Sequence, residues 1–139
     1  MAESLTRTSG VVLRGCGSAT PNRSISNEDL GQRVETSDSW IRSRTGIAAR
    51  KVVGADESLA ELSAQAAERA LQMAGWSADS LDLILLATST PDDLFGSAPR
   101  LQARLGATNA VAFDLTAACS GFLFALVTAA QYLRTGAMA

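Results

Sequence analysis

The sequence predicts an α/β fold in which parallel strands alternate with helices. Residues 81–88 (LDLILLAT) and 110–115 are almost wholly apolar, as strands are when helices cover both faces of their sheet. Helical patterns precede, separate and follow these two stretches, which is the order of elements in an α/β protein. A chain of 139 residues with 47% hydrophobic residues is also long enough to bury a core.

The first sixty residues predict short elements. A strand is expected at residues 11–14 and a short helix at residues 27–34. A second short helix is expected after residues 36–38 (TSD), whose side chains are typical helix caps, and Gly46 is expected to end it.

The later elements are longer. Ser58 and Glu61 have the spacing of a capping box and open an amphipathic helix that ends at Gly75. Further helices are expected at residues 97–105 and at residues 118–135. A strand should follow the last helix and none does, so we expect a single domain that is truncated before its last strands.

Composition excludes several classes of function. The formal net charge of −2 gives no basic patch for nucleic acid. No apolar run is long enough to cross a membrane, and the first ten residues contain no secretory signal. The two cysteines lack metal-ligand spacing and are typical of free thiols in a reducing compartment, so we expect a cytoplasmic protein without a metal.

Cys119 is the first candidate for chemistry. It stands where an apolar strand meets an apolar helix, at the sheet edge where α/β proteins place their sites. A helix N-terminus there favours a thiolate and a developing oxyanion. From position alone, a buried cysteine that only fills space is an equal alternative. We expect Cys16 to be structural.

Three other features have a functional and a structural interpretation. Trp40 and Arg44 lie on one helix face and could hold a base and a phosphate, or could be a core anchor and a solvated charge. Phe95 could be a core or staple contact before a helix. The Asp92–Asp93 pair could suggest a metal or acid–base site, but adjacent carboxylates in a turn are usually only solvated.

Three segments resemble one enzyme family, β-ketoacyl-acyl-carrier-protein synthase III. They are residues 113–126 (FDLTAACSGFLFAL), 36–50 (TSDSWIRSRTGIAAR) and 83–106 (LILLATSTPDDLFGSAPRLQARLG), and they keep the order and approximate spacing of that family. The resemblance runs from about Val11 to the end of the chain.

The resemblance implies a thiolase-like fold, built from two similar α/β halves that each have a mixed sheet with helices on both faces. Residues 1–139 would be the N-terminal half, incomplete, with the C-terminal half absent. The family is homodimeric in its full-length form. Its histidine and asparagine, which assist decarboxylation, belong to the second half, which would explain why this chain has no histidine.

The resemblance also implies a reaction. An acetyl group passes from acetyl-CoA to Cys119, and decarboxylative condensation with malonyl-acyl carrier protein then gives acetoacetyl-acyl carrier protein. Coenzyme A thioester is a substrate, so no cofactor is expected. We expect residues 1–139 alone to be inactive in condensation and to associate or dissolve poorly, because a half-fold exposes a sheet edge.

Particular residues take roles from the resemblance. Trp40 and Arg44 match residues that contact the coenzyme A nucleotide, with Thr36 nearby. Phe95 matches a phenylalanine that lines the acyl pocket of the partner subunit across the dimer. Residues 91–93 (PDD) depart from the smaller residues often found there, which leaves the preferred primer open. Two alternatives remain: a related thiolase-fold synthase that uses longer acyl primers, and a non-catalytic coenzyme A-binding fragment.

Overall fold

The computed structural model describes residues 10–138, which contain two compact units. The smaller unit is Ala19–Ser58, and the larger one comprises the residues before and after it. The first nine residues, where the sequence contains no apolar signal segment, lie outside the described residues. No helix of the described part is both long and apolar enough to cross a membrane.

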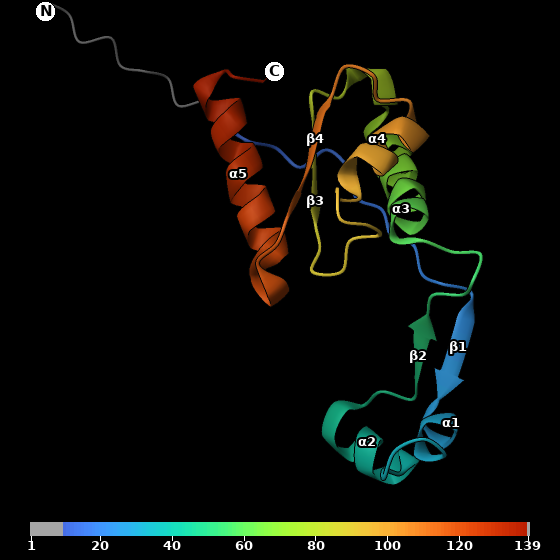
Figure 1. Ribbon diagram of the computed structural model, residues 1–139. Coiled ribbons are helices and arrows are strands. Elements are labelled where there is room, and N and C mark those ends of the chain that lie inside the picture. The colour runs from blue at the N-terminus through green and yellow to red at the C-terminus, as the bar shows by residue number, and fades with distance from the viewer. Residues whose placement is uncertain (1–9, 139) are drawn as a thin grey trace, which may run out of the picture. The chain divides into compact units, whose positions relative to one another are not determined.

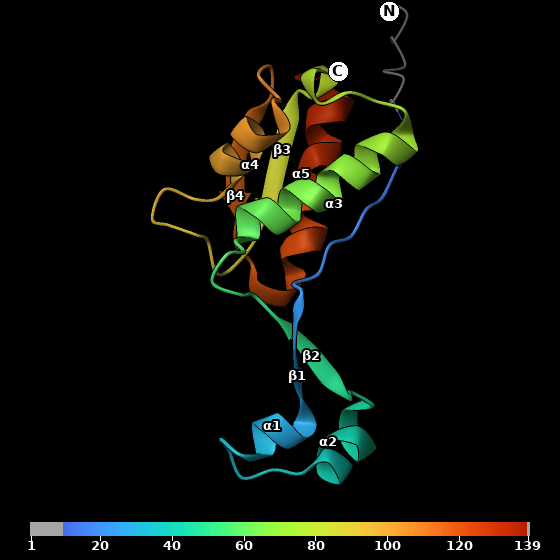
Figure 2. The ribbon, with the colours of Figure 1, turned by 90° about the vertical axis from the view of Figure 1, so that its right-hand side faces the viewer.

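The larger unit has three layers around a pair of parallel strands (Figure 1). Strand β3 (Leu83–Ala87) pairs with β4 (Val111–Leu115) in parallel, with Leu83 opposite Val111 and Ala87 opposite Leu115. The helices α3 (Leu59–Ala74) and α4 (Ala98–Leu105) cover one face, and α5 (Gly121–Thr135) covers the other (Figures 1 and 2). The predicted α/β alternation with parallel strands is confirmed.

A small apolar cluster holds the layers together. Ile84 of β3 packs with buried residues from α3, α4 and the segment before β4, namely Ala64, Leu101, Ala107 and Ala110. Three of these five residues are alanines, so the backbones of helix and strand approach closely. A cluster of this kind depends on close packing more than on the area of any one side chain.

Two acidic side chains, one from a loop and one from β4, cap both helices on this face. The Asp92 carboxylate accepts hydrogen bonds from the backbone N–H groups of Leu59 (3.0 Å) and Ala60 (3.0 Å), at the start of α3. Asp114 accepts from Ser97 and Ala98 at the start of α4. Each carboxylate satisfies N–H groups that have no partner within the helix and opposes the positive end of the helix dipole.

The prediction of a strand at residues 11–14 is wrong, because this segment forms no regular secondary structure. No described strand pairs with it to accept and donate the hydrogen bonds that a strand needs. Val12 and Leu13 are 71% and 80% exposed. The residue after this segment, Gly15, approaches the backbone of α3 closely: a Cβ added at Gly15 would lie 2.3 Å from the carbonyl oxygen of Ala70.

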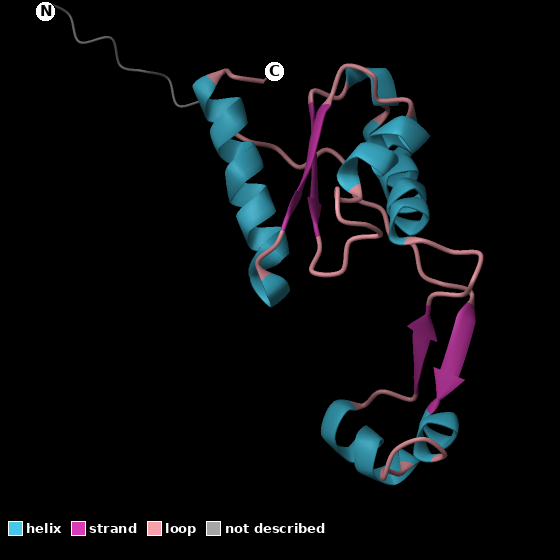
Figure 3. Ribbon diagram, in the orientation of Figure 1, coloured by secondary structure: helices cyan, strands magenta, loops and turns pink. Residues whose placement is uncertain are grey.

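The smaller unit is a two-stranded antiparallel ribbon that ends in two short helices (Figure 3). Strand β1 (Arg23–Ser26) pairs with β2 (Ala49–Val52), and the helices α1 (Asn27–Gly31) and α2 (Asp38–Thr45) connect them. The sequence predicted α2 with its caps, since Ser37 accepts from the Trp40 N–H and Gly46 is left-handed (φ 72°). It predicted α1 three residues too long and missed both strands.

Candidate functional site

Cys119 lies in a tight turn between β4 and α5. The turn is a 3-10 helix, Ala118–Ser120, and Ala118 has a positive φ of 47°, which L-residues rarely adopt outside functional or tightly constrained sites. Gly121 follows at the start of α5, where an added Cβ would lie 3.3 Å from the Cβ of Ala87 at the end of β3. The turn therefore holds Cys119 at the carboxyl end of the parallel strands, as predicted.

The Cys119 side chain is exposed, so the interpretation as a buried space-filling residue is wrong. It lines an open, largely apolar cavity of about 860 Å³ between β3 and α5. Leu85, Ala87, Phe122 and Ala125 are among the apolar residues that surround this space. A thiol at the wall of such a cavity is accessible to a substrate that carries an apolar group.

The N-terminus of α5 lies directly after the thiol. Ser120 precedes this 15-residue helix, and its side chain accepts no hydrogen bond from the first N–H groups of the helix. The Ser120 side chain therefore does not offset the positive end of the helix dipole. A helix end of this kind favours negative charge on atoms placed beside it. The geometry thus supports a nucleophilic sulfur and a polarised carbonyl at the same place.

No general base accompanies Cys119 in the described residues. Apart from Cys119, the titratable residues that line the cavity are Asp82 and Tyr132. Asp82 precedes β3 and so lies at the opposite end of the parallel sheet. Tyr132 lies eleven residues beyond the start of α5, about 16 Å along the helix axis. Neither is placed to exchange a proton with the thiol.

The other cysteine has a packing role. The backbone N–H of Cys16 lies 3.4 Å from the sulfur of Met73 on α3, and the two sulfur atoms are 3.8 Å apart. Cys16 is exposed, and its contacts support the structural role that the sequence predicted.

The Asp92–Asp93 pair is neither a metal site nor merely solvated. Asp92 caps α3, and Asp93 forms an ion pair with Arg100 (3.3 Å) and accepts from the Phe95 N–H (2.8 Å). The described residues contain no group of acidic, histidine or cysteine side chains that could hold a metal ion. Both carboxylates therefore shape the loop between β3 and α4.

Phe95 projects from that loop. Its side chain is 89% exposed and that of Leu94 is 94% exposed, which contradicts a core or staple contact. Both residues border a hollow of about 400 Å³, whose other lining residues include Thr88 and Thr116 at the ends of β3 and β4. Phe95 and Cys119 therefore lie on two loops that follow neighbouring parallel strands.

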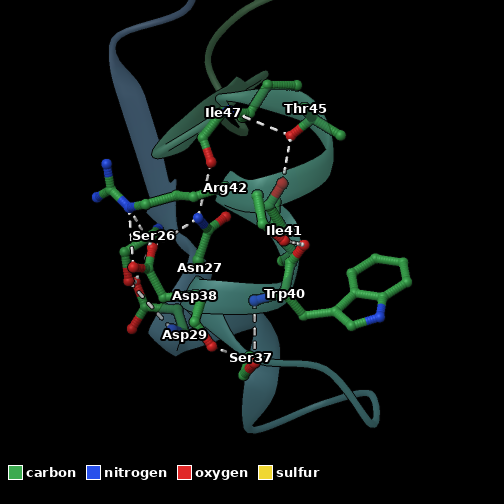
Figure 4. A network of polar contacts seen from close by, with 12 residues as sticks. Ser26, Asn27, Asp29, Ser37, Asp38, Trp40, Ile41, Arg42, Thr45 and Ile47 are labelled. Carbon is green, nitrogen blue, oxygen red and sulfur yellow. Dashed lines mark hydrogen bonds and ion pairs between the residues drawn. The ribbon is translucent and has the colours of Figure 1, made fainter.

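Helix α2 presents Trp40 and Arg44 together. The Arg44 guanidinium carbon lies 4.4 Å from the centre of the Trp40 ring, a cation–π contact. Trp40 is 54% exposed and Arg44 is exposed, so the interpretation of Trp40 as a core anchor is wrong. The indole extends away from the body of the unit (Figure 4). An exposed aromatic plane beside a guanidinium is suited to a base and a phosphate.

Thr36 lies just before α2. Its hydroxyl oxygen is buried and has no hydrogen-bond partner in the described part of the chain. A buried hydroxyl without a partner is energetically unfavourable by itself. The predicted place of Thr36 near a ligand stays a prediction.

Sequence reasoning missed Asn27. Its side chain is completely buried and forms three hydrogen bonds. Its amide nitrogen donates to the Asp38 carboxylate and to the carbonyl oxygen of Ile47, both at 2.8 Å (Figure 4). Its carbonyl oxygen accepts from Arg50 at 2.9 Å. An asparagine at the start of a short helix is ordinary, so the sequence contained no signal for this network.

The network sets the charge of Asp38. The Asn27 amide and then the Arg42 guanidinium, which donates at 2.7 Å, hold the pKa of Asp38 below its usual value. Nearby, the backbone and side chain of Ser26 lower the pKa of Asp29 in the same way. The carboxylates around α1 and α2 are therefore stabilised in their charged form.

The chain is similar to known proteins along most of its length. The family described as 3-oxoacyl-acyl-carrier-protein (ACP) synthase III matches residues 113–139, which include Cys119 and α5. A curated β-ketoacyl-acyl-carrier-protein synthase III of Prochlorococcus marinus (strain MIT 9313) is 75% identical over 138 residues, which are 99% of this chain and 41% of that protein. The chain matches the N-terminal part of the β-ketoacyl-acyl-carrier-protein synthase III family.

Solved structures place the fold in the same family. The crystal structure of 3-oxoacyl-acyl-carrier-protein synthase III from Aquifex aeolicus VF5 is 42% identical, with a TM-score of 0.87 over 91% of this chain and 41% of that one. A priming β-ketosynthase of the R1128 polyketide pathway is 36% identical, with a TM-score of 0.83 over 89% of this chain and 37% of that one. The described residues thus have the thiolase-like fold of synthase III, as predicted.

The chain covers only part of the length of these relatives. The chain spans about 41% of the length of the Prochlorococcus marinus relative. In this synthase III-like chain, the structure brings Trp40 and Arg44 together on α2, and it places Cys119 and Phe95 on adjacent loops of the larger unit.

Proposed function

We propose that this chain supplies the acyl-accepting cysteine and the coenzyme A-binding helix of a β-ketoacyl-acyl-carrier-protein synthase III that starts fatty-acid synthesis. The observation that carries the proposal is the place of Cys119: exposed, at the N-terminus of α5, and at the wall of an apolar cavity. The comparisons support the same activity, since the relatives are named for it.

In the first half-reaction, the Cys119 thiolate attacks the carbonyl carbon of acetyl-CoA. A new carbon–sulfur bond forms, the bond to the coenzyme A sulfur breaks, and the released thiolate takes a proton from water. The strained turn and the α5 N-terminus would fix the sulfur and stabilise the oxyanion that develops.

In the second half-reaction, malonyl-acyl carrier protein loses carbon dioxide and its carbanion attacks the acetyl thioester. The Cys119 sulfur leaves as a thiolate, and acetoacetyl-acyl carrier protein is released. The described residues offer no group beside Cys119 that would assist decarboxylation. We therefore expect residues 1–139 by themselves to accept an acyl group but not to catalyse condensation.

We assign the nucleotide of coenzyme A to α2. Trp40 would stack on the adenine and Arg44 would bind a phosphate, with Thr36 nearby just before α2. Phe95 is exposed on its loop and would reach the acyl pocket of a second subunit in a homodimer. Such an enzyme would act in the cytoplasm and need no cofactor beyond its thioester substrate, and residues 1–139 would form part of its N-terminal half.

Mass spectrometry of the acylated protein tests this function. The protein expressed from its complete reading frame is incubated with acetyl-CoA, digested and mapped. We expect a mass increase of one acetyl group on the peptide that contains Cys119, which Cys119→Ala abolishes and Cys16→Ala leaves unchanged. Acetylation at Cys16, or none at either cysteine while the protein stays folded, would contradict the proposal.

A second candidate is a related synthase that uses longer acyl primers. The apolar cavity of about 860 Å³ beside Cys119 favours it, because an acetyl group would occupy only a small part of that space. A series of acyl-CoA substrates from two to ten carbons distinguishes the two. A rate of Cys119 acylation that rises with chain length favours the longer primer, and a rate that falls from acetyl onward favours initiation.

A further inference from the structure

Three of the four hydrogen-bonding positions of the Asn27 side chain are occupied. Its two amide hydrogens go to Asp38 and Ile47, and its carbonyl oxygen receives Arg50. The side chain is 0% exposed, so water does not take over any of these bonds. A buried polar group that is satisfied in this way fixes the backbone around it in one arrangement.

These three partners enclose α2. Asp38 is the first residue of the helix, Ile47 lies in the turn just beyond its end, and Arg50 lies on β2. Asn27 itself begins α1, so one side chain connects both ends of α2 to the neighbouring helix and strand (Figure 4). Ile41 is the only buried apolar residue of α2, which leaves this helix with little packing to hold it.

The helix is also too short to be stable without such support. It has eight residues, and an isolated helix of this length is marginal in water. Trp40 and Arg44 point outward from it, and neither contributes to a core. The orientation of this pair therefore depends on the polar contacts that fix the two ends of α2.

We infer that Asn27 is a positioning residue for nucleotide recognition: it holds α2 in the arrangement in which Trp40 and Arg44 meet the nucleotide of an acyl-CoA. The inference rests on the proposed function of α2 and extends it to a residue that does not touch the ligand. A small rotation of α2 would separate the ring and the guanidinium from their targets, so binding weakens while the chemistry at Cys119 does not change.

Asn27→Asp provides the sharpest test. It keeps the size of the side chain but removes both amide donors and places a carboxylate beside Asp38, where like charges repel. Asn22→Asp is the matched control, because it makes the same charge change at an exposed position of the same unit. Both variants are made in the protein expressed from its complete reading frame.

The readout is a comparison of two acyl donors. Acetyl-CoA carries the nucleotide, whereas the acetyl thioester of N-acetylcysteamine lacks it and reports only on Cys119. We expect Asn27→Asp to raise KM for acetyl-CoA about tenfold, equivalent to about 1.4 kcal/mol, with kcat within twofold. The rate of Asn27→Asp with the truncated donor should equal that of the wild type. Asn22→Asp should match the wild type with both donors.

An equal loss with both donors would overturn the inference, because it would show a general defect of folding. An unchanged KM would overturn it as well. Arg50→Met is a milder variant that removes one hydrogen bond and leaves the other two, and it should raise KM for acetyl-CoA by a smaller factor without affecting the truncated donor.

Trp40→Ala separates the inference from the proposed function. If Trp40→Ala raises KM for acetyl-CoA and Asn27→Asp does not, α2 binds the nucleotide and only the positioning role fails. If Trp40→Ala leaves KM unchanged, the nucleotide site on α2 fails, and the role of Asn27 fails with it.

Discussion

The backbone N–H of Ser97 donates to the Asp114 carboxylate at 2.9 Å, and this contact connects the end of the Phe95 loop to β4, the strand that leads to Cys119. Asp114 lies on β4, five residues before Cys119, and the buried Ser97 lies between the Phe95 loop and α4. The Ser97 hydroxyl then accepts from the Asp92 N–H at 2.7 Å, and Asp92 caps α3. One chain of hydrogen bonds thus joins β4, the Phe95 loop and the first residues of both α3 and α4.

Asp114→Ala should destabilise the protein by about 2 kcal/mol, at the upper end for loss of a helix cap, because the N–H groups of Ser97 and Ala98 lose their acceptor. Asp114→Asn keeps an acceptor oxygen and loses only the charge, so about half that effect is expected. Urea denaturation of the protein from its complete reading frame measures both.

Asp82→Ala is the control for these variants, since Asp82 is exposed just before β3. Its effect on the free energy of unfolding should stay within about 0.5 kcal/mol. If Asp114→Ala and the wild type have equal free energies of unfolding, the hydrogen bonds from Asp114 to the start of α4 do not stabilise the fold.

Gly17→Ala should destabilise the protein by about 1–3 kcal/mol, as expected for overpacking. A Cβ at Gly17 would lie 2.0 Å from the carbonyl oxygen of Ala66 and 2.8 Å from the backbone nitrogen of Ala70, and backbone atoms cannot rotate away. Gly10→Ala meets nothing within 4 Å and serves as the control. Thermal melts of both variants check this, and equal melting temperatures would exclude the close contact with α3.

The sequence predicted the larger unit well because its elements have strong local signals. Apolar runs predicted β3 and β4, and periodicity with end glycines predicted α3, α4 and α5. The smaller unit was harder. The strands β1 and β2 have four residues each, RSIS and ARKV, and their mixed polarity does not alternate, so pairing across the ribbon defines them. Propensity alone does not find such strands.

The site was predicted by resemblance more than by pattern. Position alone left Cys119 open between nucleophile and filler, and only its exposure beside a cavity decides against the filler. Asp92 and Asp114 cap helices that are distant in sequence, a role that spacing along the chain does not reveal. Asn27 was missed for the same reason, since its three partners come together only in the fold.

Arg44→Gln should weaken coenzyme A binding about tenfold, as expected when one charged hydrogen bond to a phosphate is lost. The guanidinium is exposed, so its attraction to phosphate is screened by salt, and the difference between variant and wild type should shrink at high ionic strength. Arg134→Gln is the control, because Arg134 is exposed on α5 of the other unit. Calorimetric titration at low and high salt measures the effect, and an equal loss in Arg134→Gln would show nonspecific charge attraction.

Acid should destabilise the smaller unit. The hydrogen bond from Asn27, followed by Arg42, lowers the pKa of Asp38 from its ordinary 3.8, and backbone N–H groups of Gly54 and Asn22 lower the pKa of Glu57 from 4.5. Because these pKa values are lower in the folded state, the carboxylates contribute stability that is complete above the unfolded values. That stability is lost as the pH falls through the folded values, below about pH 4.

Hydrogen-exchange protection of the α2 amides measures this loss between pH 6 and pH 3. We expect protection to fall as the pH is lowered, and to fall less steeply in Asp38→Asn, which cannot gain a proton at that site. Asp56→Asn is the matched control, because Asp56 is an exposed carboxylate in the same unit. In this variant, the protection of the α2 amides should depend on pH as it does in the wild type. Constant protection across this range would mean that the carboxylates around α2 do not stabilise it, since their protonation would then change nothing.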